Sequence, residues 1–87
     1  MWIRSQNKKV LMKATNIFYD SEENEVLHNE GNGNYTVLGK YSTKEKALKV
    51  LDMIQESLEP YKVVYDKEIN VLPRNNEVFQ MPQEDEV

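Results

Sequence analysis

The sequence predicts an α+β domain, in which a small, mostly antiparallel sheet of about four to five short strands carries one amphipathic helix on one face. Two observations predict this fold. Apolar residues recur at helical spacing in one long segment, and short apolar or alternating runs lie on both sides of it. The chain has 87 residues, enough for one core. Residues 1–81 are therefore expected to form a single domain, followed by a disordered acidic tail at residues 82–87.

The helix is expected at Thr43–Glu59. Its apolar residues fall on one stripe, which contains Ala47, Val50, Leu51, Ile54 and Leu58. Ser42, followed three residues later by Glu45, fits a capping box, in which each side chain accepts a hydrogen bond from a backbone N–H of the first turn. Pro60 is expected to end the helix, because a proline disfavours helical geometry at the residue before it.

Before the helix, strands are expected at Met1–Ser5, within Val10–Tyr19 as one bent strand or two short ones, at Glu25–His28 and at Tyr35–Tyr41. Turn-forming residues separate them, and Glu30–Asn34 combines glycine and asparagine as hairpin loops do. Its G-x-G lies between two strands rather than between a strand and a helix. This position favours a hairpin turn over a phosphate cradle.

The strand that leads into the helix has an internal irregularity. Strict alternation would place Tyr35, Val37 and Tyr41 on one face of this strand. Gly39 interrupts the pattern, which indicates either a bulge or the close approach of another part of the backbone.

After the helix, Tyr61–Tyr65 is interpreted as a strand, with a further helical turn as the alternative. Asp66–Asn76 is mostly polar and is expected to be a loop. Glu77–Met81 is expected to form a short strand at a sheet edge, which Pro82 prevents from extending. The acidic segment Gln83–Val87 is expected to be disordered.

Composition excludes several classes of function. The chain contains no cysteine, which rules out disulfides, thiolate metal sites and a cysteine nucleophile. No apolar run is long enough to span a bilayer and the start does not resemble a signal peptide, so we expect a cytoplasmic protein without membrane contact. The net charge is −4, with bases but no acids in Met1–Tyr19 and acids but no bases in Asp20–Asn34. This distribution argues against a uniformly basic nucleic-acid binder but allows a local anion site near the N-terminus.

No residue pattern indicates an enzyme. His28 is the sole histidine, and no serine or carboxylate around it is spaced as in a catalytic triad. Glu22, Glu23 and Glu25 lack the pattern of a calcium loop, so no metal and no cofactor are expected.

Two places could bind an anion. The helix N-terminus, where Ser42–Lys44 follow Tyr41, offers free N–H groups and positive partial charge, although the capping box would occupy some of these donors. The N-terminal strand offers a planar cation beside an aromatic ring. The candidate ligand-binding residues are therefore Trp2, Arg4, Lys8, Tyr41, Ser42, Thr43 and Lys44.

The aromatic residues support two interpretations, and the sequence leaves both open. They are Trp2, Phe18, Tyr19, Tyr35, Tyr41, Tyr61, Tyr65 and Phe79. About half of them could build the core beneath the helix, or Trp2 and several tyrosines could form an exposed patch for a partner, a second subunit or a planar ligand.

Three stretches carry a resemblance: MWIRSQNKKVL at the start, LGKYSTKEKALKVLDMIQ in the middle and FQMPQEDEV at the end. They resemble small proteins, without an established activity, that are encoded by bacteriophages and mobile elements of Gram-positive bacteria. The resemblance implies a phage accessory protein that acts inside a bacterial cell, and it assigns no functional residue.

These observations lead us to expect a non-enzymatic binding protein. Since small domains are commonly stabilised by oligomerisation, a homo-oligomer is expected. By analogy with small phage proteins, it would sequester a nucleotide-like signal of host immunity or occlude a host protein. Sequestration predicts that Arg4, Lys8 or the helix start at Ser42–Lys44 lines a concave pocket together with Trp2 or a tyrosine. Occlusion predicts an exposed flat apolar patch or contact through the acidic tail. Nucleic-acid binding through the helix lysines and a structural role without a small ligand are the alternatives.

Overall fold

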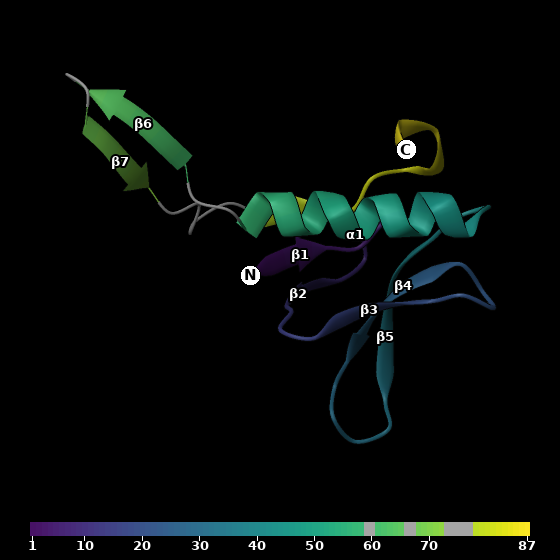
Figure 1. The fold of residues 1–87 in the computed structure, drawn as a ribbon. Helices are drawn as coiled ribbons and strands as arrows, with labels where there is room; N and C mark the ends of the chain where they lie inside the picture. Colours follow the sequence, from purple (N-terminus) through teal and green to yellow (C-terminus); the bar gives the residue numbers. More distant parts are fainter. Residues whose placement is uncertain (59–60, 66–67, 73–77) are drawn as a thin grey trace.

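The computed structural model describes residues 1–58, 61–65, 68–72 and 78–87 and confirms the α+β class. Six short strands form two three-stranded sheets, and the helix α1, Lys44–Leu58, packs against them (Figure 1). The expected single sheet is thus divided into two. One pair of strands is parallel, the pair formed by Trp2–Arg4 and Val78–Gln80, and the other pairs described are antiparallel.

Sheet A joins the two ends of the chain. Its strand order is β2-β1-β8, with β1 at Trp2–Arg4, β2 at Leu11–Lys13 and β8 at Val78–Gln80. The expected edge strand near the C-terminus is confirmed, since β8 lies at one edge of this sheet.

Sheet B is an antiparallel meander. Its strands are β3 at Ile17–Asp20, β4 at Glu25–Asn29 and β5 at Tyr35–Lys40, in the order β3-β4-β5. The segment expected to be one bent strand or two short ones therefore forms two strands, β2 and β3, in different sheets. The hairpin loop expected between β4 and β5 is confirmed, and both of its glycines have positive φ.

A bulge in sheet B corrects the expected alternation of β5. Val26 pairs with Gly39 while Leu27 pairs with Val37, so Leu38 is an extra residue in β5. The bulge turns Tyr41 into the core, away from the exposed face that carries Val37. The bulge confirms the first of the two alternatives for Gly39. A Cβ added at this glycine would lie 2.8 Å from the Tyr41 hydroxyl, so the close neighbours of Gly39 are side chains and not backbone.

One core lies between α1 and the two sheets. Ala47, Val50 and Ile54 supply the buried side of the helix, as their spacing predicts. Both sheets and the C-terminal segment contribute to the same cluster, which also contains Ile3, Ala14, Val26, Leu38, Tyr41 and Met81. Because both sheets share this core, each has one inner face and one outer face.

After α1, β6 at Tyr61–Tyr65 pairs with β7 at Glu68–Leu72 in an antiparallel hairpin. The strand expected at Tyr61–Tyr65 is confirmed. The loop expected at Asp66–Asn76 is wrong for Glu68–Leu72, where the alternating Ile69 and Val71 are typical of a strand. The roles assigned to Pro60 and to residues 73–77 lie outside the described residues.

The C-terminal segment corrects a further expectation. Residues Glu84–Glu86 form a 3₁₀ turn, η1, rather than a disordered tail. The Gln83 amide donates to the Gln6 carbonyl at 2.7 Å, and Val87 packs against the core. Tertiary contacts with residues far apart in the sequence therefore order a segment that its composition alone would leave free.

Candidate binding surface

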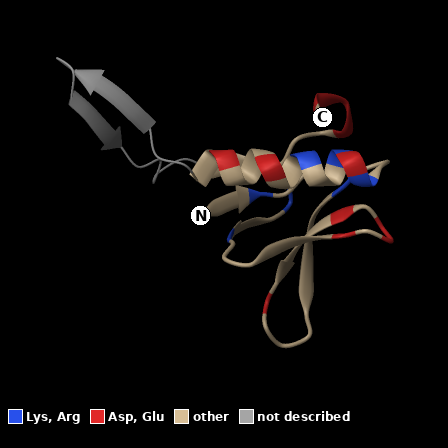
Figure 2. Ribbon diagram, viewed as in Figure 1, with Lys and Arg blue, Asp and Glu red and all other residues tan. Residues whose placement is uncertain are grey.

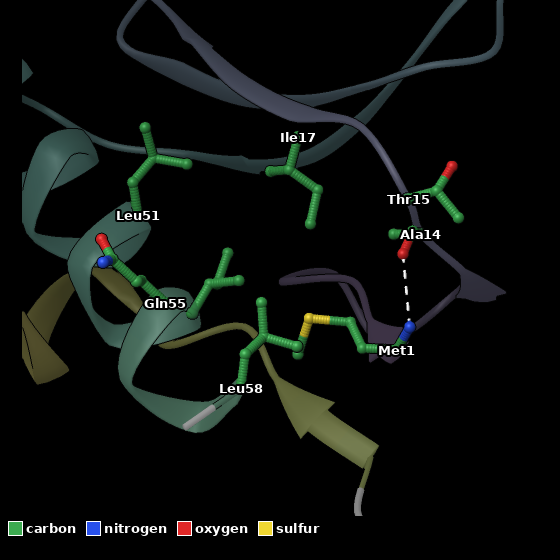
Figure 3. Close-up of a pocket in the computed structure, with 8 residues that line it drawn as sticks. Met1, Ala14, Thr15, Ile17, Leu51, Gln55 and Leu58 are labelled. Carbon is green, nitrogen blue, oxygen red and sulfur yellow. Dashed lines mark hydrogen bonds between the residues drawn. The ribbon is translucent and has the colours of Figure 1, made fainter. Parts of the chain in front are cut away.

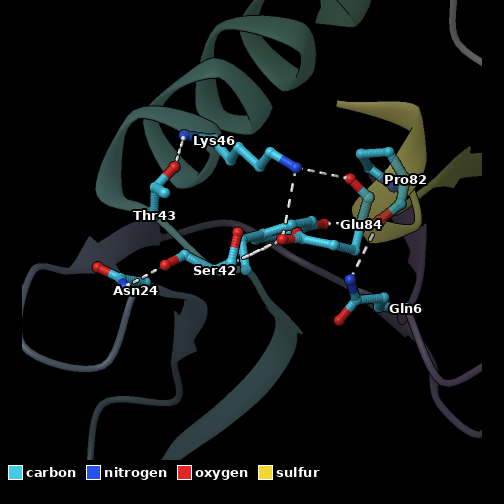
Figure 4. A network of polar contacts seen from close by, with 8 residues as sticks. Gln6, Asn24, Ser42, Thr43, Lys46, Pro82 and Glu84 are labelled. Atoms are coloured by element: carbon cyan, nitrogen blue, oxygen red, sulfur yellow. Dashed lines mark hydrogen bonds and ion pairs between the residues drawn. The ribbon is translucent and has the colours of Figure 1, made fainter.

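The start of α1 is built differently from the predicted capping box. Thr43, not Ser42, is the residue before the helix, and its Oγ1 accepts a hydrogen bond from the Lys46 N–H at 3.2 Å (Figure 4). The backbone N–H of Ser42 donates to Glu84 Oε1 at 3.0 Å instead. The cap is therefore displaced by one residue, and Ser42 contributes its backbone to a contact with the C-terminal segment.

The carboxylate of Glu84 lies beside the position at which we expected an external anion, where it accepts the Ser42 N–H. This carboxylate also lies 3.4 Å from Lys46 Nζ, which donates to the Glu84 carbonyl at 3.2 Å (Figure 4). Hydrogen bonding from Ser42 lowers the pKa of the Glu84 carboxyl, and the charge of Lys46 lowers it further. The helix start thus binds an anion that the chain itself supplies.

Tyr41, a second candidate at this site, belongs to the core. It is 4% exposed and its hydroxyl donates to the Pro82 carbonyl at 2.9 Å. Burial raises the pKa of this hydroxyl, and the nearby charges of Glu84 and Glu86 raise it further. Lys44 remains exposed on the first turn of α1. Of the four residues predicted here, Tyr41 is thus buried, the Ser42 N–H donates to Glu84, and Thr43 and Lys44 are exposed.

The other candidates, Trp2, Arg4 and Lys8, lie together at the outer face of sheet A or beside it. Ile3 points into the core, so Trp2 and Arg4 point outward. In the strand register, Trp2 stands between Lys13 and Val78. Arg4 stands between Leu11 and Gln80 in the next row. We call this set of six residues the A face.

The A face combines exposed apolar side chains with cations. Trp2 is 48%, Leu11 51% and Val78 41% exposed. Arg4 and Lys13 stand among them, and the basic segment near β1 and β2 carries no acid (Figure 2). A flat surface with a tryptophan, aliphatic residues and an arginine has the composition found at the centre of protein interfaces.

Local contacts hold the cations in place. Arg4 Nη1 donates to the Lys8 carbonyl at 3.3 Å, and Lys8 Nζ donates to Gln80 Oε1 at 3.3 Å. Lys8 has a φ of 67°, in the left-handed region that tight turns use. The turn after β1 therefore brings Lys8 back to the end of the A face.

Two cavities in the described part of the chain lie elsewhere. One has a volume of about 520 Å³ and lies between α1 and the segment that joins β2 to β3 (Figure 3). Its walls are mostly apolar, with Ile17, Leu51 and Leu58 among them. The other, of about 220 Å³, lies beside Gly39 and Lys40. None of the seven candidate ligand residues lines either cavity.

The sequence identified the N-terminal half of the A face and missed the remainder. Trp2 and Arg4 were found because the alternation of a single strand places them on one face. Leu11, Lys13 and Val78 join them only through pairing with β2 and β8. The single available signal was the apolar–basic composition of residues 11–13, which did not reveal the partner strand.

Among the described residues, no cluster of His, Asp and Glu is arranged to hold a metal ion, and no helix is long and apolar enough to cross a membrane. Comparisons with protein-family models, with curated proteins and with solved structures find no match. The A face is therefore interpreted from its own geometry and chemistry.

Proposed function

We propose that this chain is a non-enzymatic protein that binds another protein through the A face. The observation that carries the proposal is the exposure of Trp2, Leu11 and Val78 on one sheet face next to Arg4 and Lys13. Such a surface is complementary to an apolar patch with acidic residues at its edge. Burial of the tryptophan would supply affinity, and the cations would supply orientation and a faster encounter.

The geometry supports binding of a protein better than sequestration of a nucleotide. Small molecules are usually held in concave pockets that bury most of their surface. The Trp2 side chain lies on an open face, and Glu84 already occupies the helix start. Lys46, one of the lysines that could contact nucleic acid, is paired with Glu84 as well.

The resemblance to proteins of phages and mobile elements supports a context for this activity. In that context the chain acts in the cytoplasm of a bacterial host and blocks a surface that a host protein needs. Occlusion of this kind requires a stable complementary face and no catalytic group.

The test measures capture of a host protein and its dependence on the A face. The immobilised chain is exposed to lysate of a Gram-positive bacterium, and the captured protein is then purified and titrated against variants. Trp2→Ser is expected to weaken binding by about tenfold or more, since buried tryptophans dominate interface energies. Lys49→Ala, which changes an exposed lysine on α1, serves as the matched control and is expected to leave affinity unchanged.

A second arm separates a protein ligand from a nucleotide. Trp2 is the sole tryptophan, so its fluorescence reports occupation of the A face. Titration with nucleoside triphosphates and with a single-stranded oligonucleotide is expected to leave the emission unchanged. If a nucleotide shifted the Trp2 emission saturably and no protein were captured from the lysate, the proposal would be overturned and the ligand would be a nucleotide.

A further inference from the structure

Sheet B carries a second apolar surface on its outer face. Phe18, Leu27 and Val37 form one row across the three strands, and the rings of Phe18 and Tyr35 meet edge to face at 5.5 Å. Leu27 is only 7% exposed although it does not belong to the main core. Tyr35 and Val37 are 56% and 45% exposed. We call these four residues the B face.

The surroundings of the B face are acidic. Asp20 and Glu25 are a register pair on the same outer surface, and Glu30 lies in the hairpin loop beyond Tyr35. Figure 2 shows the acidic positions, in red, at the two ends of sheet B. Lys40, the basic residue of β5, stands opposite Glu25 in the strand register and lies 3.5 Å from Glu23. Next to the B face, Asp20 and Glu25 therefore outnumber the single cation Lys40, whereas the A face carries Arg4 and Lys13 and no acid.

The two faces match in kind and oppose each other in charge. Each is an exposed aromatic and aliphatic surface on a three-stranded sheet, and each faces away from the shared core. We infer that the B face of one copy docks on the A face of another, with Asp20 and Glu25 opposite Arg4 and Lys13. Because the two surfaces differ, this contact is heterologous, and each copy keeps one free A face or B face for further growth or ring closure.

This assembly rests on the proposed function in one respect, because it uses the same A face that binds the partner. Self-association and partner binding then exclude each other. A concentrated pool of the chain would keep its A faces covered, and a partner of higher affinity would release single copies.

The experiment is sedimentation velocity on the full chain over a range of concentrations, at low and at high salt. The wild-type chain is expected to form species larger than a monomer, and these are expected to dissociate at high salt because screening weakens the charge pairs. Trp2→Ser removes the A face, and the double variant Tyr35→Ser/Val37→Ser removes the B face. All three residues are exposed, and circular dichroism verifies that both variants fold.

Mixing the two variants gives the decisive result. Each alone is expected to be monomeric, while an equimolar mixture is expected to form a one-to-one complex, since one variant retains the B face and the other the A face. Leu48→Ser, on an exposed part of α1, is the control and is expected to associate as the wild type does. A wild-type chain that stays monomeric, or self-association by the Tyr35→Ser/Val37→Ser variant alone, would overturn the inference.

The same variants distinguish this failure from failure of the proposed function. Tyr35→Ser/Val37→Ser is expected to bind the captured host protein at least as tightly as the wild type, because it removes the competing copy. The wild-type chain could be monomeric while the Trp2→Ser variant no longer binds the captured host protein. In that case the head-to-tail assembly is refuted and the proposed function stands.

Discussion

His28 is buried on the inner face of sheet B. It is 7% exposed, and neither Nδ1 nor Nε2 has a hydrogen-bond partner among the described residues. Its register partners are Ile17 and Thr36. A buried polar group without a partner costs about 1–3 kcal/mol, so His28 reduces stability at this position.

Replacing His28 with an apolar residue of similar size should therefore stabilise the fold. We expect His28→Leu to raise the free energy of unfolding by about 1 kcal/mol, measured by urea denaturation at neutral pH. His28→Gln keeps a polar group in the same place and should give no gain. If His28→Leu were clearly less stable than the wild type, the imidazole would have a stabilising contact in solution.

A second prediction at the residue scale separates the two possible helix caps. Thr43 Oγ1 accepts the Lys46 N–H, whereas Ser42 offers its backbone N–H to Glu84. Thr43→Ala is expected to cost about 0.5–2 kcal/mol in thermal or chemical unfolding, as loss of a helix cap does. Ser42→Ala, the matched control, should cost less because it leaves that backbone N–H in place. Equal losses in the two variants would contradict the cap at Thr43.

At the scale of elements, η1 contacts the start of α1 through Glu84, and we call this contact the clasp. The basic residues of α1, Lys44, Lys46 and Lys49, all lie in its first half, so the N-terminal end of the helix combines their charge with the positive end of the dipole. Glu84 compensates this charge from the far end of the chain. The clasp therefore joins the C-terminus to the middle of the sequence and depends on an ionised carboxylate.

This dependence predicts a pH effect. The pKa of Glu84 is lower in the folded protein than its ordinary value of 4.5. The unfolded chain then binds more protons in this range, so the stabilisation from Glu84 is complete above pH 4.5 and is lost as the pH falls through the folded pKa. Glu84→Gln should lower the melting temperature at neutral pH, with the difference from wild type vanishing in acid.

Asp85→Asn is the control for this prediction. Asp85 is the next carboxylate in η1, is exposed, and makes no hydrogen bond or ion pair with the described residues. Its substitution should leave the melting temperature unchanged at both pH values. A constant difference between Glu84→Gln and wild type across this range would contradict an ionised clasp.

The elements also show which parts of the fold a sequence encodes locally. The stripe Ala47–Ile54 and the hairpin loop Glu30–Asn34 depend on neighbours in the chain, and both were predicted correctly. The order of η1 and the parallel pairing of β1 with β8 depend on residues at opposite ends of the sequence. From composition alone, η1 is predicted to be a disordered tail and β8 an edge strand without an identified partner. The contacts that stabilise them leave no pattern in the neighbouring sequence.

The candidate site follows the same rule. Trp2 and Arg4 share a face by strand alternation, which a sequence displays directly. At the predicted anion site Ser42–Lys44, the backbone N–H of Ser42 donates to a carboxylate of the chain itself. This carboxylate belongs to Glu84, which lies forty-two positions after Ser42 in the sequence. A local sequence pattern cannot predict a contact over that separation.

At the scale of the whole molecule, the two sheets unfold as one unit if the shared core governs stability. Ile3 of sheet A and Val26 of sheet B both lie in the cluster under α1, and each is fully buried. The outer A and B faces lie outside this cluster and are free for contacts. Substitutions there should alter association without altering the fold, whereas a substitution in the core should affect both sheets together.

Ile54→Ala tests this cooperativity. Ile54 is 4% exposed in the shared cluster, so its truncation is expected to cost about 2–5 kcal/mol. Trp2 fluorescence reports on sheet A and far-ultraviolet circular dichroism reports mainly on α1, and in urea both should shift to the same lower midpoint. Leu48→Ala, at an exposed position of the same helix, should change the free energy of unfolding by less than about 1 kcal/mol. Two separate midpoints in Ile54→Ala would mean that sheet A unfolds independently of the helix, and the shared core would then not be the unit of stability.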